Sequence, residues 1–324
     1  MQSTALVDLV IDTLAEAEEA PVPPLVDAFA HVPDPRRRQG RRYPLPFLLC
    51  ALVLALLCNC DTLEAVGQWC TEHRALLAAH FPDQRFHTPT GSLYRRLLPR
   101  LSVAHLEAAL ALWVRGSLEA ASGDALALDG KTVRGAASAG RAAPHLLSVS
   151  THASGETLLQ VRVAEKTNEI PVARVLFPAL PLAGRVVTAD ALHTQVATAQ
   201  AILDQDADYL LVVKANQPTL YAECAAYFTD PTARVRQATT IDRRRGRTET
   251  RTLDATGRLR AHLKRYTRFP AIGQVACLLT TVEERRGGAP HREARFLLTS
   301  LTPRQADPAR LLTLARGHWS IEMV

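Results

Sequence analysis

Two short apolar runs of the chain each lead into a single aspartate. Residues 125–128 precede Asp129, and residues 186–189 precede Asp190. Each run has the length and composition of a buried strand, and an uncompensated carboxylate out of water costs several kcal/mol. If both strands belong to one sheet, the two carboxylates can lie side by side at its edge. They would then raise each other's pKa unless a divalent cation neutralised them.

Magnesium suits such a pair, because it prefers oxygen ligands and keeps positions open for water and phosphate. Two ions about 4 Å apart can activate a water and stabilise the leaving oxygen of a phosphodiester. The alternative for each aspartate taken alone is a helix N-cap or a turn, where Asp is common. Their repetition after two strands in an α/β order favours a metal site.

The elements that position these residues change in type near residue 120. Before it, apolar periodicity predicts helices at 1–20, 47–58, from about 61 towards His73, from about 89, and at 102–118. After it, the sequence predicts strands at 125–128, 146–151, 157–163, 185–189 and 209–213, with helices at 169–176, 194–204 and 219–228. The first strand is predicted to end at once on Gly130. This order predicts an α/β domain with three antiparallel strands, followed by strands joined through helical crossovers.

The last third of the chain has a different pattern. Residues 232–300 are charged and β-like, with further strands at 275–282 and 294–298, and a helix from 308 continues through Glu322. The sequence therefore predicts an all-helical N-terminal domain at 1–120 and an α/β domain at 121–324. Within the latter, a β-rich insertion occupies about 232–300.

Composition limits the classes of protein that fit. Hydrophobic residues make up 47%, enough for a sizeable core, and the net charge of +6 favours an anionic partner such as nucleic acid. A merely basic enzyme could carry the same charge. The six cysteines lack zinc-site spacing, which predicts reduced, buried thiols. The apolar run at 45–58 is shorter than the roughly 20 residues of a membrane span, so a core helix is favoured, and no signal peptide is recognised.

Several stretches carry a family resemblance. Residues 128–132 (Leu-Asp-Gly-Lys-Thr) and 188–195 resemble the first and second acidic motifs of DDE transposases. Residues 209–217 resemble the strand and turn that come after the second motif, and residues 316–322 resemble the start of the third. The closest group is the bacterial insertion-sequence transposases related to H-repeat-associated proteins, whose N-terminal domain is similar to residues 34–42 and 89–96.

The resemblance implies a ribonuclease-H-like α/β catalytic domain with a β-rich insertion. It implies that Asp129, Asp190 and Glu322 are catalytic and bind two Mg²⁺ ions, with Mn²⁺ as a substitute. Water would be activated to nick double-stranded DNA at the ends of the element, and the freed 3′-hydroxyl would attack target DNA. The resemblance further implies a homodimer assembled on DNA, no membrane, and a cytoplasmic, nucleoid-associated protein.

Basic clusters and polar turn residues are candidates for contact with DNA. The DNA-binding candidates are Arg36, Arg37, Arg38, Arg41, Arg42, Arg95, Arg96, Lys131, Lys214, Asn216 and Gln217. Each basic cluster could equally be a solvated face, and the last three residues could be a plain turn before a proline. His193 is predicted to be an ordinary turn residue and Trp319 to pack in the core. His318 is expected to reach either DNA or solvent.

The family pattern continues after its glutamate with an asparagine and a further helix, whereas Met323 and Val324 follow Glu322 here. This departure predicts that Glu322 is poorly held, because a helix end without its next turns loses packing and hydrogen bonds. Two alternatives to a transposase therefore stay open. One is an inactive, truncated remnant that binds DNA, and the other is a nuclease of the same fold. A membrane protein is the least favoured alternative.

Overall fold

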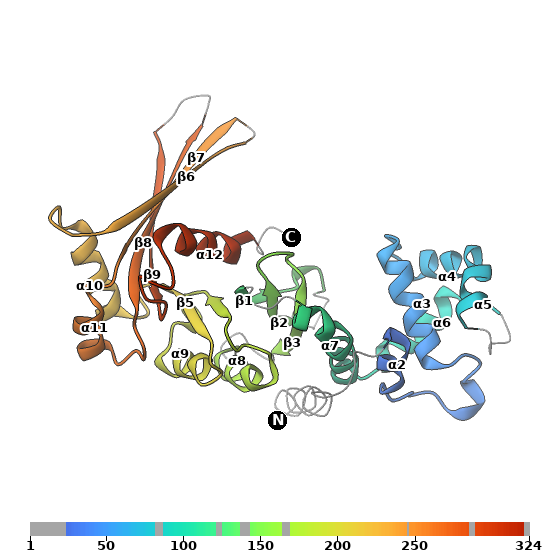
Figure 1. Cartoon of the computed structure of the whole chain (residues 1–324). Coiled ribbons are helices and arrows are strands. Elements are labelled where there is room, and N and C mark those ends of the chain that lie inside the picture. The colour runs from blue at the N-terminus through green and yellow to red at the C-terminus, as the bar shows by residue number, and fades with distance from the viewer. Residues whose placement is uncertain are drawn as a thin grey trace. The chain divides into compact units, whose positions relative to one another are not determined.

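The computed structural model describes residues 24–81, 87–120, 125–136, 143–163, 169–244, 246–284 and 289–320, without the side chains of 114–120, 134, 179 and 320. The chain forms two compact units that divide between Leu118 and Glu119. The first unit is helical and the second is built on one sheet (Figure 1). The helix predicted at 1–20 lies outside the described residues.

The first unit consists of short helices packed on one apolar core. Its elements are α2 (Leu25–Ala30), the turn η1 (Arg38–Gly40), α3 (Leu45–Leu57), α4 (Leu63–Glu72), α5 (Arg74–His80), α6 (Gly91–Leu97), the turn η2 (Leu98–Arg100) and α7 (Val103–Ala120). Thr62 precedes α4, and its side chain caps that helix by accepting a hydrogen bond from the Ala65 N–H at 3.1 Å. The cap fixes where α4 starts.

Two glycines let α4 and α6 touch backbone to backbone. A Cβ at Gly67 would lie 2.6 Å from the Gly91 nitrogen, and a Cβ at Gly91 would lie 2.5 Å from the Leu63 carbonyl oxygen. Any larger residue at either position would separate the two helices. This crossing sets the place of α6, which carries Arg95 and Arg96.

Helix α3 is apolar along its length. The segment Arg38–Leu57 is long and apolar enough to cross a membrane by length and composition alone. In the structure α3 buries Leu45, Phe47, Leu48, Leu49, Cys50, Ala51 and Ala55 in the core of the first unit. Only at its end are Leu56 and Leu57 more than half exposed. The burial agrees with the predicted core helix.

The second unit contains a nine-stranded sheet in its described part, with the order β3-β2-β1-β4-β5-β9-β8-β7-β6. The strands are β1 (Ala125–Thr132), β2 (His145–Thr151), β3 (Thr157–Val163), β4 (Val186–Ala189), β5 (Asp208–Val213), β6 (Arg236–Arg244), β7 (Arg247–Thr256), β8 (Gln274–Glu284) and β9 (His291–Thr299). Strands β1 to β3 are antiparallel, while β1, β4 and β5 run parallel. This is the arrangement that the sequence predicts for the first five strands.

The predicted break of the first strand at Gly130 is wrong. Strand β1 continues to Thr132, because β2 pairs with it along the whole stretch from Asp129↔Ser148 to Thr132↔His145. The parallel pairing with β4 does stop earlier, at Leu128↔Ala189. Asp129 is therefore the first residue of β1 beyond β4, and not the last residue of its strand.

The strands of the predicted insertion belong to the same sheet. Strand β9 pairs antiparallel with β5, so β6 to β9 extend the sheet that holds β1 and β4. A helix that the sequence did not reveal, α11 (Arg260–Thr267), interrupts this segment. Leu263 is the one buried residue of α11, so the apolar stripe is too narrow to stand out in the sequence. The hairpin of β6 and β7 reaches away from the rest of the unit (Figure 1).

Helices cover the sheet and join its strands. They are α8 (Glu169–Leu176), α9 (Val196–Leu203), α10 (Pro218–Thr229) and α12 (Pro308–Ser320), together with the short turn η6 (Ala191–His193). Leu311, Leu312 and Ala315 of α12 share a buried core with sheet residues such as Ala125 and Val186. Helix α12 packs against β1, β4, β6 and β7. The six cysteines are free, and Cys50, Cys70 and Cys224 are buried as predicted. The prediction of buried thiols is wrong for the exposed Cys58, and Cys60 and Cys277 are only partly buried.

Candidate active site

The structure brings Asp129 and Asp190 together at one edge. Leu128 pairs with Ala189 across two parallel strands, so the next residue of each strand is an aspartate at the same level. Asp129 is half-buried, and no hydrogen bond or ion pair reaches its carboxylate from the described residues. Asp190 is exposed, and its Oδ1 accepts the Leu192 N–H at 2.9 Å. Asp190 therefore also acts as the N-cap at the start of η6, which is the role that the sequence offered as an alternative to metal binding.

Asp129 lies on the face of the sheet that α12 covers. Side chains two apart on a strand share a face, so Asp129 lies on the face of Ala125, which packs in the core with α12. His318 of α12 is buried, and its Nδ1 lies 3.2 Å from the Thr188 hydroxyl, two residues before Asp190. The side chain predicted to reach DNA or solvent is thus enclosed.

His318 lies within electrostatic reach of both aspartates. Burial lowers the pKa of His318 below its ordinary value of 6.5, while the charges of Asp129 and Asp190 act in the opposite direction without reversing the shift. The imidazole is therefore neutral near pH 7, which leaves the charge of the aspartates uncompensated by this residue. On the other side of Thr188, its hydroxyl lies 2.8 Å from His152 Nε2.

Helix α12 is fixed by side chains before and after His318. A Cβ at Gly317 would lie 2.1 Å from His152 Nδ1, so only glycine leaves room for that ring. Arg316 Nη2 lies 2.9 Å from Asp242 Oδ2 on β6, and Arg251 Nη1 on β7 lies 2.6 Å from the same oxygen. Trp319 packs against the core as predicted, with the Arg295 guanidinium carbon 4.4 Å from its ring centre.

A buried acid–histidine cluster supports β1 from its other face. Glu169 at the start of α8 is 2% exposed, and its carboxylate pairs with His145 Nε2 on β2 and lies 3.3 Å from His193 Nε2. A Cβ at Gly130 would lie 2.5 Å from the carboxylate carbon of Glu169. The glycine after Asp129 therefore makes room for a carboxylate, and this is why the strand can pass through it.

Electrostatics in this cluster favour the ionised form of Glu169. Burial acts to raise the pKa of Glu169, but hydrogen bonds and charges from His193 and His145 outweigh it and hold the pKa below its ordinary value of 4.5. The His145 Nδ1 lies 2.9 Å from the Thr132 hydroxyl, which links the cluster to the end of β1. His193, predicted to be an ordinary turn residue, does lie in the turn η6 but is buried.

Sequence reasoning missed Glu169 and His145 as parts of this site. The available signal was a glycine directly after a strand aspartate, which suggests that another group approaches the backbone closely. The identity of that group depends on where α8 packs, which no local pattern reveals. The cluster becomes visible only in three dimensions.

The third acidic residue, Glu322, lies outside the described residues, whose last helix ends at Ser320. Within the part of the chain that the structure describes, no group of three His, Cys, Asp or Glu side chains could hold a metal ion. The two aspartates alone offer oxygen ligands of the kind that Mg²⁺ prefers, next to a sheet edge that is not fully buried. The residues present therefore fit a magnesium site that needs a further ligand.

Polar candidates after β5 hold the loop that follows Asp190. Asn216 Nδ2 donates to the Ala191 carbonyl at 2.6 Å, and Gln217 Nε2 donates to the Thr194 carbonyl at 2.8 Å. Lys214 directly follows β5 and is exposed. Lys131 lies half-buried on β1, two residues after Asp129. Contact of these four residues with DNA stays a prediction, and the two amides have a structural task as well.

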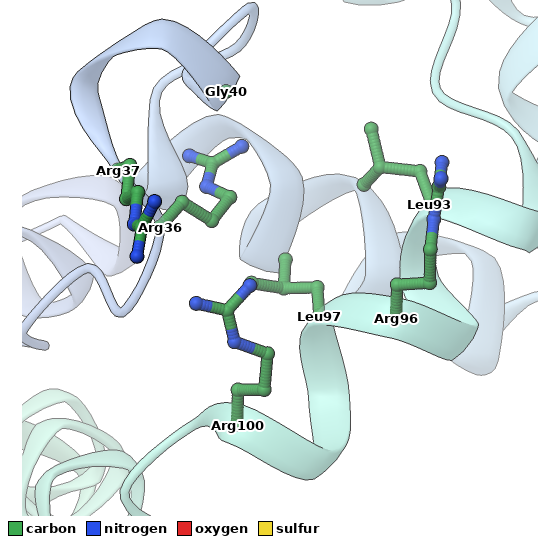
Figure 2. A pocket seen from close by; sticks show the side chains of 7 residues that line it. All are labelled: Arg36, Arg37, Gly40, Leu93, Arg96, Leu97 and Arg100. Carbon is green, nitrogen blue, oxygen red and sulfur yellow. The ribbon is translucent and has the colours of Figure 1, made fainter.

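The basic candidates of the first unit fall into two groups. Arg36, Arg37 and Arg96 line one pocket, shown in Figure 2. Outside it, Arg95 forms an exposed ion pair with Glu64, and Arg41 Nε lies 3.3 Å from Asp34 Oδ2. The remaining two, Arg38 and Arg42, are exposed and line no part of the pocket. Spacing along the chain could not separate these groups.

Comparisons with known proteins agree with the resemblance. Residues 121–324 match the family model described as Transposase DDE domain, and residues 26–114 match the model described as DDE_Tnp_1-associated. "Putative transposase YncI" of Escherichia coli O157:H7 is 29% identical over 199 residues, which cover 61% of this chain and 51% of that protein. The chain thus spans about half the length of that relative.

Two other relatives differ in how much of their length is matched. "Uncharacterized protein in dhlA 3'region" of Xanthobacter autotrophicus is 30% identical over 288 residues, covering 86% of this chain and 94% of that protein. "H repeat-associated putative transposase YhhI" of E. coli strain K12 is 26% identical over 198 residues, covering 60% and 52% respectively.

Among solved structures, the piggyBac transposase synaptic complex with hairpin DNA covers 98% of this chain and 64% of that chain. The identity is 10% and the TM-score is 0.39, at which the likeness supports no inference. The two family models and the curated relatives do carry the assignment, because one model spans most of the chain. The chain belongs to the DDE-type transposases of bacterial insertion sequences.

Proposed function

We propose that this protein cleaves DNA at the ends of an insertion sequence and joins the freed 3′ end to target DNA. The observation that supports this most is the register of β1 and β4, which puts Asp129 and Asp190 at one level on neighbouring parallel strands. The order of three antiparallel strands followed by two parallel ones supports the ribonuclease-H-like fold that the family resemblance implies.

Glu322 is proposed as the third ligand. It follows the buried His318 by four residues, the spacing at which residues of a helix share a face. The charges of both aspartates act on His318, which supports a role for Glu322 in the same site. Asp129, Asp190 and Glu322 would hold two Mg²⁺ ions, or Mn²⁺ in their place. Bound there, the ions supply activation of the attacking oxygen and stabilisation of the leaving oxygen.

The surrounding residues keep these ligands in place. Glu169 supports β1 behind Asp129, and Asn216 with Gln217 holds the loop after Asp190. Double-stranded DNA is the proposed substrate, bound by the basic residues of the first unit and by Lys131 and Lys214. A homodimer assembled on DNA, acting in the cytoplasm at the nucleoid, is the proposed working form.

The decisive experiment replaces Asp129. Asp129→Asn should lower Mg²⁺-dependent cleavage of DNA that carries the element's ends by more than about a hundredfold, since even loss of an outer-shell partner costs 10–100-fold. DNA binding should be retained. Asp204→Asn is the matched control, because Asp204 is an exposed aspartate of the same unit. Undiminished cleavage by Asp129→Asn would remove Asp129 from the site.

The products of the same assay separate the alternatives. A transposase gives joined strand-transfer product, whereas a nuclease of the same fold gives only cuts. A remnant that binds DNA gives neither product at any Mg²⁺ or Mn²⁺ concentration. Glu322→Gln should abolish both products if Glu322 is a ligand, and a variant that keeps them would show that the third ligand lies elsewhere.

A further inference from the structure

A strongly basic pocket of about 430 Å³ opens on the first unit. Its lining residues come from the segment 36–40 and from α6 with η2, as Figure 2 shows: Arg36, Arg37, Gly40, Leu93, Arg96, Leu97 and Arg100. Four of these seven are arginines and none is acidic. Like charges that share a pocket repel one another, so a bound anion would stabilise the arrangement.

Arg36 has a buried nitrogen without a partner. Its side chain is 9% exposed, Nε and Nη2 donate to the Asp34 carboxylate at 2.9 Å, and Nη2 also donates to the Tyr43 carbonyl at 2.7 Å. Its Nη1 is buried and makes no hydrogen bond. An unsatisfied buried donor of a charged group costs roughly 1–3 kcal/mol or more. The acceptor that Nη1 lacks would be supplied by an anionic oxygen in the pocket.

The other three arginines keep donors available. The Arg37 guanidinium makes no hydrogen bond or ion pair with any residue that the structure describes. Arg96 uses only Nε, which donates to the Ser92 carbonyl at 3.2 Å. Arg100 Nη2 donates to the Pro35 carbonyl at 2.6 Å and so ties η2 to the segment before Arg36. The pocket is therefore braced across its two walls and still presents free N–H groups.

The lining identifies the class of ligand. Guanidinium groups match the geometry of phosphate oxygens and bind them in pairs of hydrogen bonds. Leu93 and Leu97 add an apolar wall, which suits a sugar next to the phosphate better than a hydrated free ion.

We propose that this pocket binds one backbone phosphate of DNA, with the adjoining deoxyribose against Leu93 and Leu97. The proposal rests on DNA being the substrate, and it adds Arg100, Leu93 and Leu97 to the DNA-binding residues. Contacts of this kind fix the position of the duplex without reading its bases.

The test compares a pocket arginine with an exposed arginine that belongs to no proposed site, both in the full chain. Arg96→Gln removes a pocket residue, whereas Arg258→Gln removes an exposed residue of the second unit, and each variant loses one positive charge. Binding to a DNA duplex is measured by fluorescence anisotropy over a series of salt concentrations. Arg96→Gln should lower the slope of log K against log[salt] by about 0.9 and weaken binding equally for all duplex sequences. Arg258→Gln should leave the slope unchanged.

Equal slopes for the two variants would overturn the inference, provided that circular dichroism shows both to be folded. Binding of inorganic pyrophosphate, measured by calorimetry, is the second arm. A wild-type chain that binds pyrophosphate through Arg96 but binds no DNA overturns the assignment to DNA backbone and points to a free phosphate. If the variants agree in slope while cleavage still requires Asp129, the pocket inference fails and the proposed transposase function stands. If Arg96→Gln alone lowers the slope while cleavage is independent of Asp129, the pocket inference stands and the proposed role of Asp129 in cleavage fails.

Discussion

Each unit places an acid beside a charged candidate residue, but the two arrangements differ. In the first unit, Arg36 in the basic pocket is held by Asp34, with side chains 9% and 14% exposed. In the second, the backbone next to Asp129 is supported by the buried Glu169 between His145 and His193. Arg36 is thus paired directly with an acid of opposite charge, whereas Asp129 lies next to another carboxylate, whose own partners are two histidines. The two acids also differ in depth, since Glu169 is almost fully enclosed and Asp34 is not.

Depth should decide how much each unit depends on its acid. Glu169→Ala leaves His145 and His193 buried without their common partner, so we expect a loss of about 3–5 kcal/mol in the stability of the second unit, as for other broken buried pairs. Chemical denaturation measures it. Glu156→Ala, which alters an exposed glutamate of the same unit, is the control. A loss no larger than that of the control would mean that the cluster contributes nothing.

The shallower acid should matter less. Asp34→Asn weakens the charge-assisted hydrogen bonds to Arg36, and we expect a loss of about 1.5–3 kcal/mol in the first unit alone. Hydrogen exchange read from peptides of α3 and of β1 assigns the loss to one unit. Asp61→Asn serves as the exposed control. If peptides of β1 lose protection as well, the two units are not independent in stability.

A smaller change tests the support of β1 without touching a charge. Gly130→Ala puts a methyl 2.5 Å from the Glu169 carboxylate, and overpacking of this kind costs about 1–3 kcal/mol. Cleavage should fall together with stability, because Asp129 is the next residue. In the Glu169→Ala background the same substitution should cost much less, since the clash is gone. Equal costs in both backgrounds would contradict the contact.

Lowering the pH should produce the smallest effect, and it should destabilise the two units one after the other. The folded-state pKa of Glu169 lies below 4.5 and that of Asp34 below 3.8, since burial acts to raise each pKa but hydrogen bonds and charges from the partners outweigh it. Stability from a lowered carboxyl pKa is complete above the unfolded value and is lost as pH falls through the folded one. Hydrogen exchange should therefore show β1 weakening before α3 as pH drops below 4.5. Glu169→Gln should remove this early step.

Helices and strands whose characteristic sequence pattern lies within the element itself could be predicted from the sequence. The bounds of β3 and α8 agree with the prediction, since their apolar periods and flanking turns lie within the segment itself. The course of β1 through Gly130 was not predictable, because it depends on β2 pairing alongside and on Glu169 packing above. Likewise, the adjacency of β9 and β5 is a long-range pairing that no local pattern encodes.

The candidate sites divide along the same line. Asp129 and Asp190 were found because each follows an apolar run of strand length in the sequence, and the parallel register of β1 and β4 then brought them together. The grouping of Arg96 with Arg36 depends instead on the close crossing of α4 and α6 at Gly67 and Gly91. The sequence shows that a residue is basic, whereas the fold determines which residues surround it.

The ion pairs of Asp242 connect the β6–β7 hairpin to α12. One ladder of hydrogen bonds runs from β6 through β9 and β5 to β4 and β1, and Arg316 ties α12 to β6 at the same time. The hairpin is thus connected to the strands that carry Asp129 and Asp190 by two routes, one through the sheet and one through α12.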